Sequence, residues 1–211
     1  MIITNDGKHA FLAVPKTGSA SATDLIKTNA ANLVLVSPLN HPTAPEFIRY
    51  LHTNNITIDP DIRFYAFWRD PVERFFSACA YVKKQPEKTI RNTLHDYFSD
   101  CNAANFQTKL NALTTSDFIS IIDSLERPTA QKIFLPQHPW YDFFIHDELQ
   151  LLPFSDYTNQ LTKLATIFGV DNITSIPAIN YTGSVVSGTD AELATIRDLF
   201  KQDYTYSLNP L

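Results

Sequence analysis

Residues 9–25 read HAFLAVPKTGSASATDL, and this stretch carries the clearest indication of the fold. Its first six residues form a short apolar run of the kind that makes a buried parallel strand. A loop with a proline, a lysine and a glycine follows, and a helical pattern begins at Ser21. The order strand, loop, helix predicts a loop that lies where a strand ends and a helix begins.

Strand and helix patterns alternate through the first third of the chain. Further buried-type strands are predicted at residues 32–36 and 62–68, and helices at 43–52 and 70–82. This alternation predicts an α/β fold with a central parallel sheet flanked by helices.

The rest of the chain continues this pattern. Residues 86–127 are polar and are predicted to be helical, and a loop at 134–146 leads into another strand. We expect Ser155 to cap a helix over residues 156–168, and Gly169 to end that helix.

Composition limits the class of protein. The chain has 211 residues, of which 44% are hydrophobic and 18% charged, so one globular domain over residues 1–211 is predicted. The net charge is −5, whereas a general nucleic-acid binder carries a basic balance, so no nucleic-acid partner is predicted. The two cysteines, Cys79 and Cys101, lack the spacing of zinc ligands and favour a reducing compartment. No stretch approaches the ~20 apolar residues of a membrane span, so a cytoplasmic protein is predicted.

The loop after the first strand has the chemistry of an anion site. Backbone N–H groups and the positive end of the helix dipole meet at a helix N-terminus, and Lys16 adds a full charge. Gly18 lets the backbone approach closely, and hydroxyl donors stand at Thr17, Ser19 and Ser21. The alternative is that Ser19 or Ser21 only caps the helix. Because Lys16 precedes the single glycine, the loop is not a Walker A loop, GxxxxGK[ST], and a small P-loop kinase is disfavoured.

A second motif, FWRDPVERFFSACAY, lies at the end of the third predicted strand. Asp70 and Pro71 form a good helix start. Arg69 leaves the carboxyl end of the strand, where ligands bind in open α/β sheets, and Ser77 lies eight residues further on. Arginine suits bidentate phosphate binding and serine adds a donor, so Arg69 and Ser77 are candidate anion ligands.

Together, PKTGSAS and RDPVERFFSA resemble the nucleotide-binding elements of sulfotransferases that use 3′-phosphoadenosine 5′-phosphosulfate (PAPS), nearest to the carbohydrate and heparan-type branch and its bacterial relatives. The segments NHPTAPEF, LPQHPW and PAINYTGS also resemble that family. The resemblance implies a single P-loop-like α/β domain with PAPS as co-substrate and no metal. It implies transfer of a sulfonyl group to a hydroxyl or amine of an acceptor, a carbohydrate or another small molecule.

By position, the resemblance assigns five residues to the 5′-phosphosulfate, namely Lys16, Thr17, Gly18, Ser19 and Ser21. It assigns Arg69 and Ser77 to the 3′-phosphate. Lys16 would also act in catalysis, because it would stabilise the charge that develops on the leaving phosphate. Many family members carry a hydroxyl residue where this chain has Ala20, so one phosphate contact is expected to be missing.

The base that takes the proton from the acceptor is expected to be a histidine. His41 stands in HPTA, which resembles an HxTA-like position of the family and follows the second predicted strand. His138, in PQHPW, is the alternative base. Candidates to fold over the nucleotide are Asn180, Tyr181 and Ser184. Two other functions stay open, a non-catalytic nucleotide-binding protein of the same fold and the small P-loop kinase.

Overall fold

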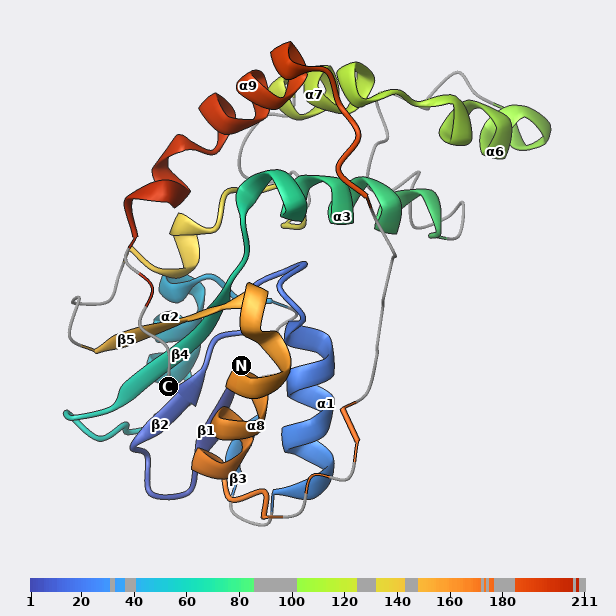
Figure 1. Ribbon diagram of the computed structural model, residues 1–211. Helices are drawn as coiled ribbons and strands as arrows, with labels where there is room; N and C mark the ends of the chain where they lie inside the picture. The colour runs from blue at the N-terminus through green and yellow to red at the C-terminus, as the bar shows by residue number, and fades with distance from the viewer. Residues whose placement is uncertain are drawn as a thin grey trace. The chain divides into compact units, whose positions relative to one another are not determined.

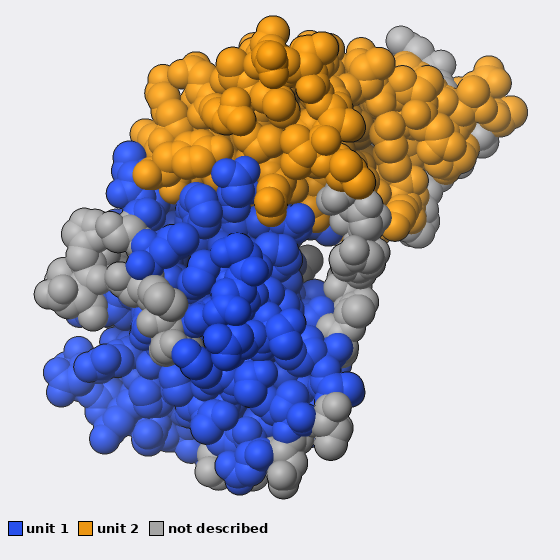
Figure 2. Space-filling model, in the orientation of Figure 1, with its two compact units in different colours: residues 1–70, 136–181, 205–211 blue, residues 71–135, 182–204 orange. Residues whose placement is uncertain are grey.

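The computed structural model of the chain describes residues 1–30, 33–36, 41–85, 102–124, 132–142, 148–171, 173, 175–176, 185–206 and 208. The chain divides into two compact units (Figure 2). Unit 1 comprises residues 1–70, 136–181 and 205–211, and unit 2 comprises residues 71–135 and 182–204. The prediction of one domain over residues 1–211 stays a prediction.

Unit 1 is built on a five-stranded sheet with the order β3-β1-β2-β4-β5 (Figure 1). The strands are β1 Ile2–Thr4, β2 His9–Phe11, β3 Leu33–Val36, β4 Arg63–Trp68 and β5 Leu149–Pro153. β4 pairs in parallel with both β2 and β5, whereas β1 is antiparallel to both β2 and β3. Four strands therefore point in one direction and β1 points in the other. The prediction of an α/β fold is confirmed, but the sheet is mixed rather than wholly parallel.

β1 is the strand that the sequence pattern did not predict. It is three residues long and joins β2 through a tight turn, in which Gly7 has a φ of 70° and its N–H donates to the Thr4 carbonyl at 3.0 Å. The Asp6 carboxylate accepts from the Thr4 hydroxyl at 2.7 Å and from the Lys8 N–H at 3.0 Å, which stabilises the turn. Three residues are too few for a periodicity to be recognised, and this explains the omission.

Helices cover both faces of this sheet. α1 (Ser19–Asn29) and α8 (Tyr157–Ile167) lie on one face, and α2 (Ala44–Thr53) lies on the other (Figure 1). The core beneath α1 and α8 combines strand and helix side chains, including Phe11, Phe67, Leu25, Leu161 and Phe168. Each of these side chains is 5% exposed or less.

Two predicted helix ends differ from those observed. α1 begins at Ser19, two residues earlier than predicted, with Gly18 at the N-cap position. Ser155 does not cap α8, because residues 154–156 form a 3₁₀ turn, η2, and Asp156 takes the N-cap position without a side-chain bond. Gly169 ends α8 as predicted, with a φ of 79° and its N–H on the Thr166 carbonyl at 3.0 Å.

The carboxyl ends of β2, β3, β4 and β5 meet at one edge of the sheet, because these strands run in one direction. The loop to α1 follows β2, and Arg69 follows β4. His41 lies between β3 and α2, and η2 follows β5. Ligands of open α/β sheets bind at this edge.

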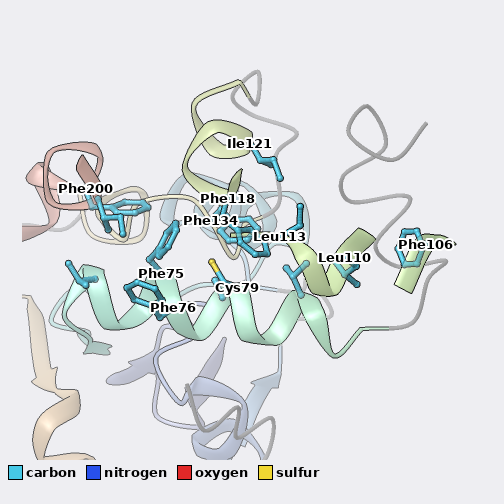
Figure 3. Packing of buried hydrophobic residues seen from close by; sticks show 14 residues of the cluster. Phe75, Phe76, Cys79, Phe106, Leu110, Leu113, Phe118, Ile121, Phe134 and Phe200 are labelled. Carbon is cyan, nitrogen blue, oxygen red and sulfur yellow. The ribbon is translucent and has the colours of Figure 1, made fainter. Parts of the chain in front are cut away.

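Unit 2 is helical. Its helices are α3 (Pro71–Lys83), α6 (Ala103–Ala112), α7 (Thr115–Ser124) and α9 (Asp190–Leu199), and α9 is followed by the 3₁₀ turn η3 (Lys201–Thr205). They pack around an aromatic core that contains Phe75, Phe76, Phe118, Phe134 and Phe200 (Figure 3). α3 begins at Pro71, directly after Asp70, as predicted. The helical prediction for residues 86–127 is confirmed at α6 and α7, and residues 86–101 and 125–127 lie outside the described part.

Candidate functional site

The loop between β2 and α1 has an unusual backbone. Lys16 has a φ of 65° and Gly18 a φ of 77°. Of the described residues other than glycine, those with a positive φ are Lys16, His41 and Asn55. Such conformations are uncommon for residues with a side chain, and they cluster at functional sites because the surrounding structure must impose them. Two of the three thus fall on residues that the sequence singles out for catalysis.

The loop hydroxyls hold the loop together. Thr17 Oγ1 and Ser19 Oγ both donate to the Val14 carbonyl oxygen, at 3.0 and 2.6 Å, and both side chains are buried. Ser19 therefore does not cap α1, whose N-cap Gly18 has no side-chain cap bond. The first-turn N–H groups of a helix are the donors that an anion can use, and Lys16 stands in the loop just before α1. The predicted contacts of Thr17, Ser19 and the buried Ser21 with an anion stay predictions.

Gly18 is enclosed by aromatic side chains from η2 and from the first residue of α8. A Cβ atom at this position would lie 2.5 Å from Tyr157 Cε2 and 3.0 Å from Phe154 Cε2. The Tyr157 hydroxyl donates to the Gly18 carbonyl oxygen at 2.7 Å. Burial raises the pKa of Tyr157, so its hydroxyl keeps the proton that it donates. Glycine is thus required here both for its positive φ and for its lack of a side chain.

Arg69 reaches the same loop from β4. Its Nη1 donates to the Lys16 carbonyl oxygen at 3.3 Å. Its guanidinium carbon lies 4.5 Å from the centre of the Phe154 ring, a cation–π contact. The structure therefore brings the guanidinium of Arg69, which follows β4, to the backbone of Lys16 in the loop after β2.

His41, which lies between β3 and α2, also contacts this loop. Its Nδ1 lies 2.6 Å from the Ala13 carbonyl oxygen. A carbonyl oxygen only accepts hydrogen bonds, so Nδ1 carries the proton and, in the neutral imidazole, the lone pair is on Nε2. This contact fixes the ring and its tautomer, as a proton acceptor requires.

For the remaining predicted residues, a place in this site stays a prediction. Ser77 is buried on α3 in unit 2, whereas Arg69 is in unit 1, so their pairing stays a prediction. His138 begins the 3₁₀ turn η1 (His138–Trp140), and its role as the alternative base also stays a prediction. Three candidates lie outside the described residues, namely Asn180, Tyr181 and Ser184.

Sequence reasoning missed the side chains that support the site. Phe154 and Tyr157 enclose Gly18, and Gln137 holds the backbone of Arg69 with two hydrogen bonds. Gln137 belongs to the LPQHPW segment, but a glutamine in a loop predicts no contact by itself. The two aromatic residues stand at the start of a helix, where a sequence pattern indicates only packing.

Within the described residues, no group of three or more histidine, cysteine, aspartate or glutamate side chains could hold a metal ion. No described helix has the length and apolarity to cross a membrane. Comparison with family models, with curated proteins and with solved structures finds no match for this chain. The site must therefore be interpreted from its own chemistry.

Proposed function

We propose that this protein is a sulfotransferase with a P-loop-like domain, which moves a sulfonyl group from PAPS to a hydroxyl or amine of an acceptor. One observation carries the proposal. Arg69, which follows β4, and His41, which follows β3, both bond the backbone of the loop that carries Lys16 and leads into α1. The three residues supply two cations and one oriented imidazole, which suit an anionic donor and an acceptor that must lose a proton.

The donor set fits a doubly anionic phosphosulfate. The first turn of α1, which follows its N-cap Gly18, supplies backbone N–H groups. Lys16 supplies a point charge, and Arg69 supplies a planar fork that matches phosphate or sulfate oxygens. In the proposed complex, Arg69 binds the 3′-phosphate.

The reaction asks the protein for position and charge stabilisation. The acceptor oxygen or nitrogen forms a bond to sulfur, and the bond from sulfur to the 5′-phosphate oxygen breaks with its electron pair left on the phosphate. His41 Nε2 takes the proton of the acceptor. Lys16 and the N–H groups of α1 stabilise the charge on the phosphate. General-base catalysis of this kind contributes about 10²–10⁴-fold.

The acceptor class belongs to the proposal. The resemblance favours a carbohydrate or another small molecule. Two cysteines without zinc-ligand spacing favour a cytoplasmic enzyme.

A second candidate is a non-catalytic PAPS-binding protein of the same fold. Ala20 favours it, because this position in the first turn of α1 lacks the hydroxyl that many family members carry. The oriented imidazole of His41 argues against it, since binding alone needs no proton acceptor.

The test is transfer of a labelled sulfonyl group from PAPS to a panel of sugars, amines and alcohols in the presence of EDTA. The proposal expects a labelled acceptor, and loss of labelling in Lys16→Ala. Binding of adenosine 3′,5′-bisphosphate without any transfer would favour the non-catalytic protein. Phosphoryl transfer from ATP that requires magnesium would favour the kinase.

A further inference from the structure

β4 is longer than its partner β2. β2 ends at Phe11, and the last ladder contact on that side is the Leu12 N–H on the Tyr65 carbonyl at 2.8 Å. In a parallel strand, alternate residues face the same neighbour. The polar backbone groups of Phe67 and Arg69 therefore face the side from which the chain of β2 has departed to form the anion loop.

Side chains replace the missing strand there. The Tyr141 hydroxyl donates to the Phe67 carbonyl at 3.1 Å. Gln137 Oε1 accepts from the Arg69 N–H at 3.1 Å, and Gln137 Nε2 donates to the Arg69 carbonyl at 2.8 Å. The carboxamide thus bonds both polar groups of one residue, as a neighbouring strand does.

Gln137 and Tyr141 are both buried, and their side chains contact each other. Gln137 is 0% exposed and Tyr141 1% exposed, and the Tyr141 hydroxyl also lies 3.4 Å from Gln137 Oε1. A buried carboxamide with both ends bonded is held in one orientation, since any other orientation leaves polar atoms unsatisfied. Gln137 is therefore a rigid support for Arg69.

We propose that Gln137 is a positioning residue for Arg69. It extends the hydrogen bonding of β4 by one residue beyond Trp68, so that the guanidinium of Arg69 reaches the Lys16 carbonyl and the anion beside it. This inference rests on the proposed function, because it assigns to Arg69 the binding of the 3′-phosphate. A merely structural role for Gln137 would stabilise the fold without affecting which nucleotide is preferred.

The experiment measures the dissociation constants of adenosine 3′,5′-bisphosphate and AMP by calorimetry. Gln137→Ala is expected to weaken binding of the bisphosphate roughly tenfold, on the scale of one charge-assisted hydrogen bond, and binding of AMP less than about twofold. The matched control is Gln160→Ala. Gln160 is a buried glutamine of the same unit whose amide donates to Asp156, and its removal should leave the ratio of the two constants unchanged.

Two further variants keep the test decisive. Tyr141→Phe removes only a hydroxyl, and it should lower the preference for the bisphosphate about two- to threefold even if Gln137→Ala does not fold. In an Arg69→Ala background, Gln137→Ala should cause no further change in the ratio, because a positioning residue acts through Arg69.

The outcomes separate the two claims. Wild-type protein that binds both nucleotides equally overturns the proposed function, and this inference with it. Wild-type preference that persists in Gln137→Ala and Tyr141→Phe overturns this inference alone. Equal weakening of both nucleotides by Gln137→Ala, or additive effects with Arg69→Ala, shows a structural role and also overturns it.

Discussion

The Ala13 carbonyl oxygen accepts a hydrogen bond from His41 Nδ1 at 2.6 Å, although 28 positions separate these two residues in the chain. Ala13 lies in the loop between β2 and α1 that also carries Lys16, and His41 lies two residues before Thr43, which forms the capping box of α2 with Glu46. The bond therefore ties the proposed base to the proposed anion loop. It also leaves Nε2 as the basic atom of the ring.

Replacement of this base should affect the reaction and not the binding. His41→Ala should lower kcat by about 10²–10⁴-fold, because a general base typically contributes that factor. The dissociation constant of adenosine 3′,5′-bisphosphate should stay within about twofold, since an imidazole that serves the acceptor does not hold the nucleotide. Steady-state kinetics with an acceptor from the panel and calorimetry together check both expectations.

His138→Ala is the control for that measurement. It should keep near-normal kcat if His41 is the base. Normal turnover in His41→Ala with lost turnover in His138→Ala would assign the base to His138.

Gly18→Ala should be costly in stability because of its surroundings. Alanine at a positive φ costs about 1–2 kcal/mol, and this applies equally to Gly18 and Gly169. A Cβ at Gly18 also meets Tyr157 at 2.5 Å, whereas a Cβ at Gly169 has nothing within 4 Å. The free energy of unfolding should therefore fall about 1–3 kcal/mol further in Gly18→Ala than in Gly169→Ala.

Urea denaturation of both variants measures that difference. Equal losses of stability would show that Tyr157 moves aside freely, and that its ring does not hold the loop at Gly18.

Stability should depend on the ionisation of His9. Burial is the largest cause that lowers the pKa of His9, and the charges of Arg63 and Lys8 act in the same direction against the opposing Asp6 carboxylate. The unfolded chain therefore binds a proton at His9 more readily than the folded one. The contribution of neutral His9 to stability is fully present above the ordinary histidine pKa of ~6.5. It is lost as the pH falls from there towards the lower pKa of His9 in the folded protein.

The measurement is the free energy of unfolding between about pH 7.5 and 5, for wild type and for His9→Gln. His9→Gln should flatten the slope, and groups common to both proteins cancel in the comparison. Parallel curves would contradict the assignment of this slope to His9.

The capping box at the N-terminus of α9 should contribute to the stability of unit 2. Thr189 and Glu192 form a capping box, with the Thr189 hydroxyl accepting from the Glu192 N–H at 3.3 Å and Glu192 Oε2 accepting from the Thr189 N–H at 2.8 Å. Thr189→Ala should lower the free energy of unfolding by about 1 kcal/mol. Thr195→Ala, an exposed position within the same helix, should change it by less than about 0.5 kcal/mol. Equal effects of the two substitutions would contradict the cap.

The sequence predicts the loop of the site better than its supports. The strand, loop and helix at residues 9–25 were predictable because each local pattern is strong. The approach of Arg69 and His41 followed from topology, since the carboxyl ends of parallel strands share an edge. Neither conclusion needed knowledge of side-chain packing.

The supports depend on tertiary contacts that no local pattern encodes. Gln137 is 68 positions from Arg69, and Tyr157 is 139 positions from Gly18. The predicted cap at Ser155 was wrong for a related reason. Residues 154–156 form a 3₁₀ turn there, so that Phe154 and Tyr157 enclose the loop.

The most direct test of the central claim is calorimetric titration of the wild-type protein with adenosine 3′,5′-bisphosphate and with AMP, both in EDTA. If Arg69 binds a 3′-phosphate beside the Lys16 loop, the bisphosphate should bind at least about tenfold more tightly, since a charge-assisted hydrogen bond contributes about 1.5–3 kcal/mol. Equal dissociation constants for the two nucleotides would contradict the claim.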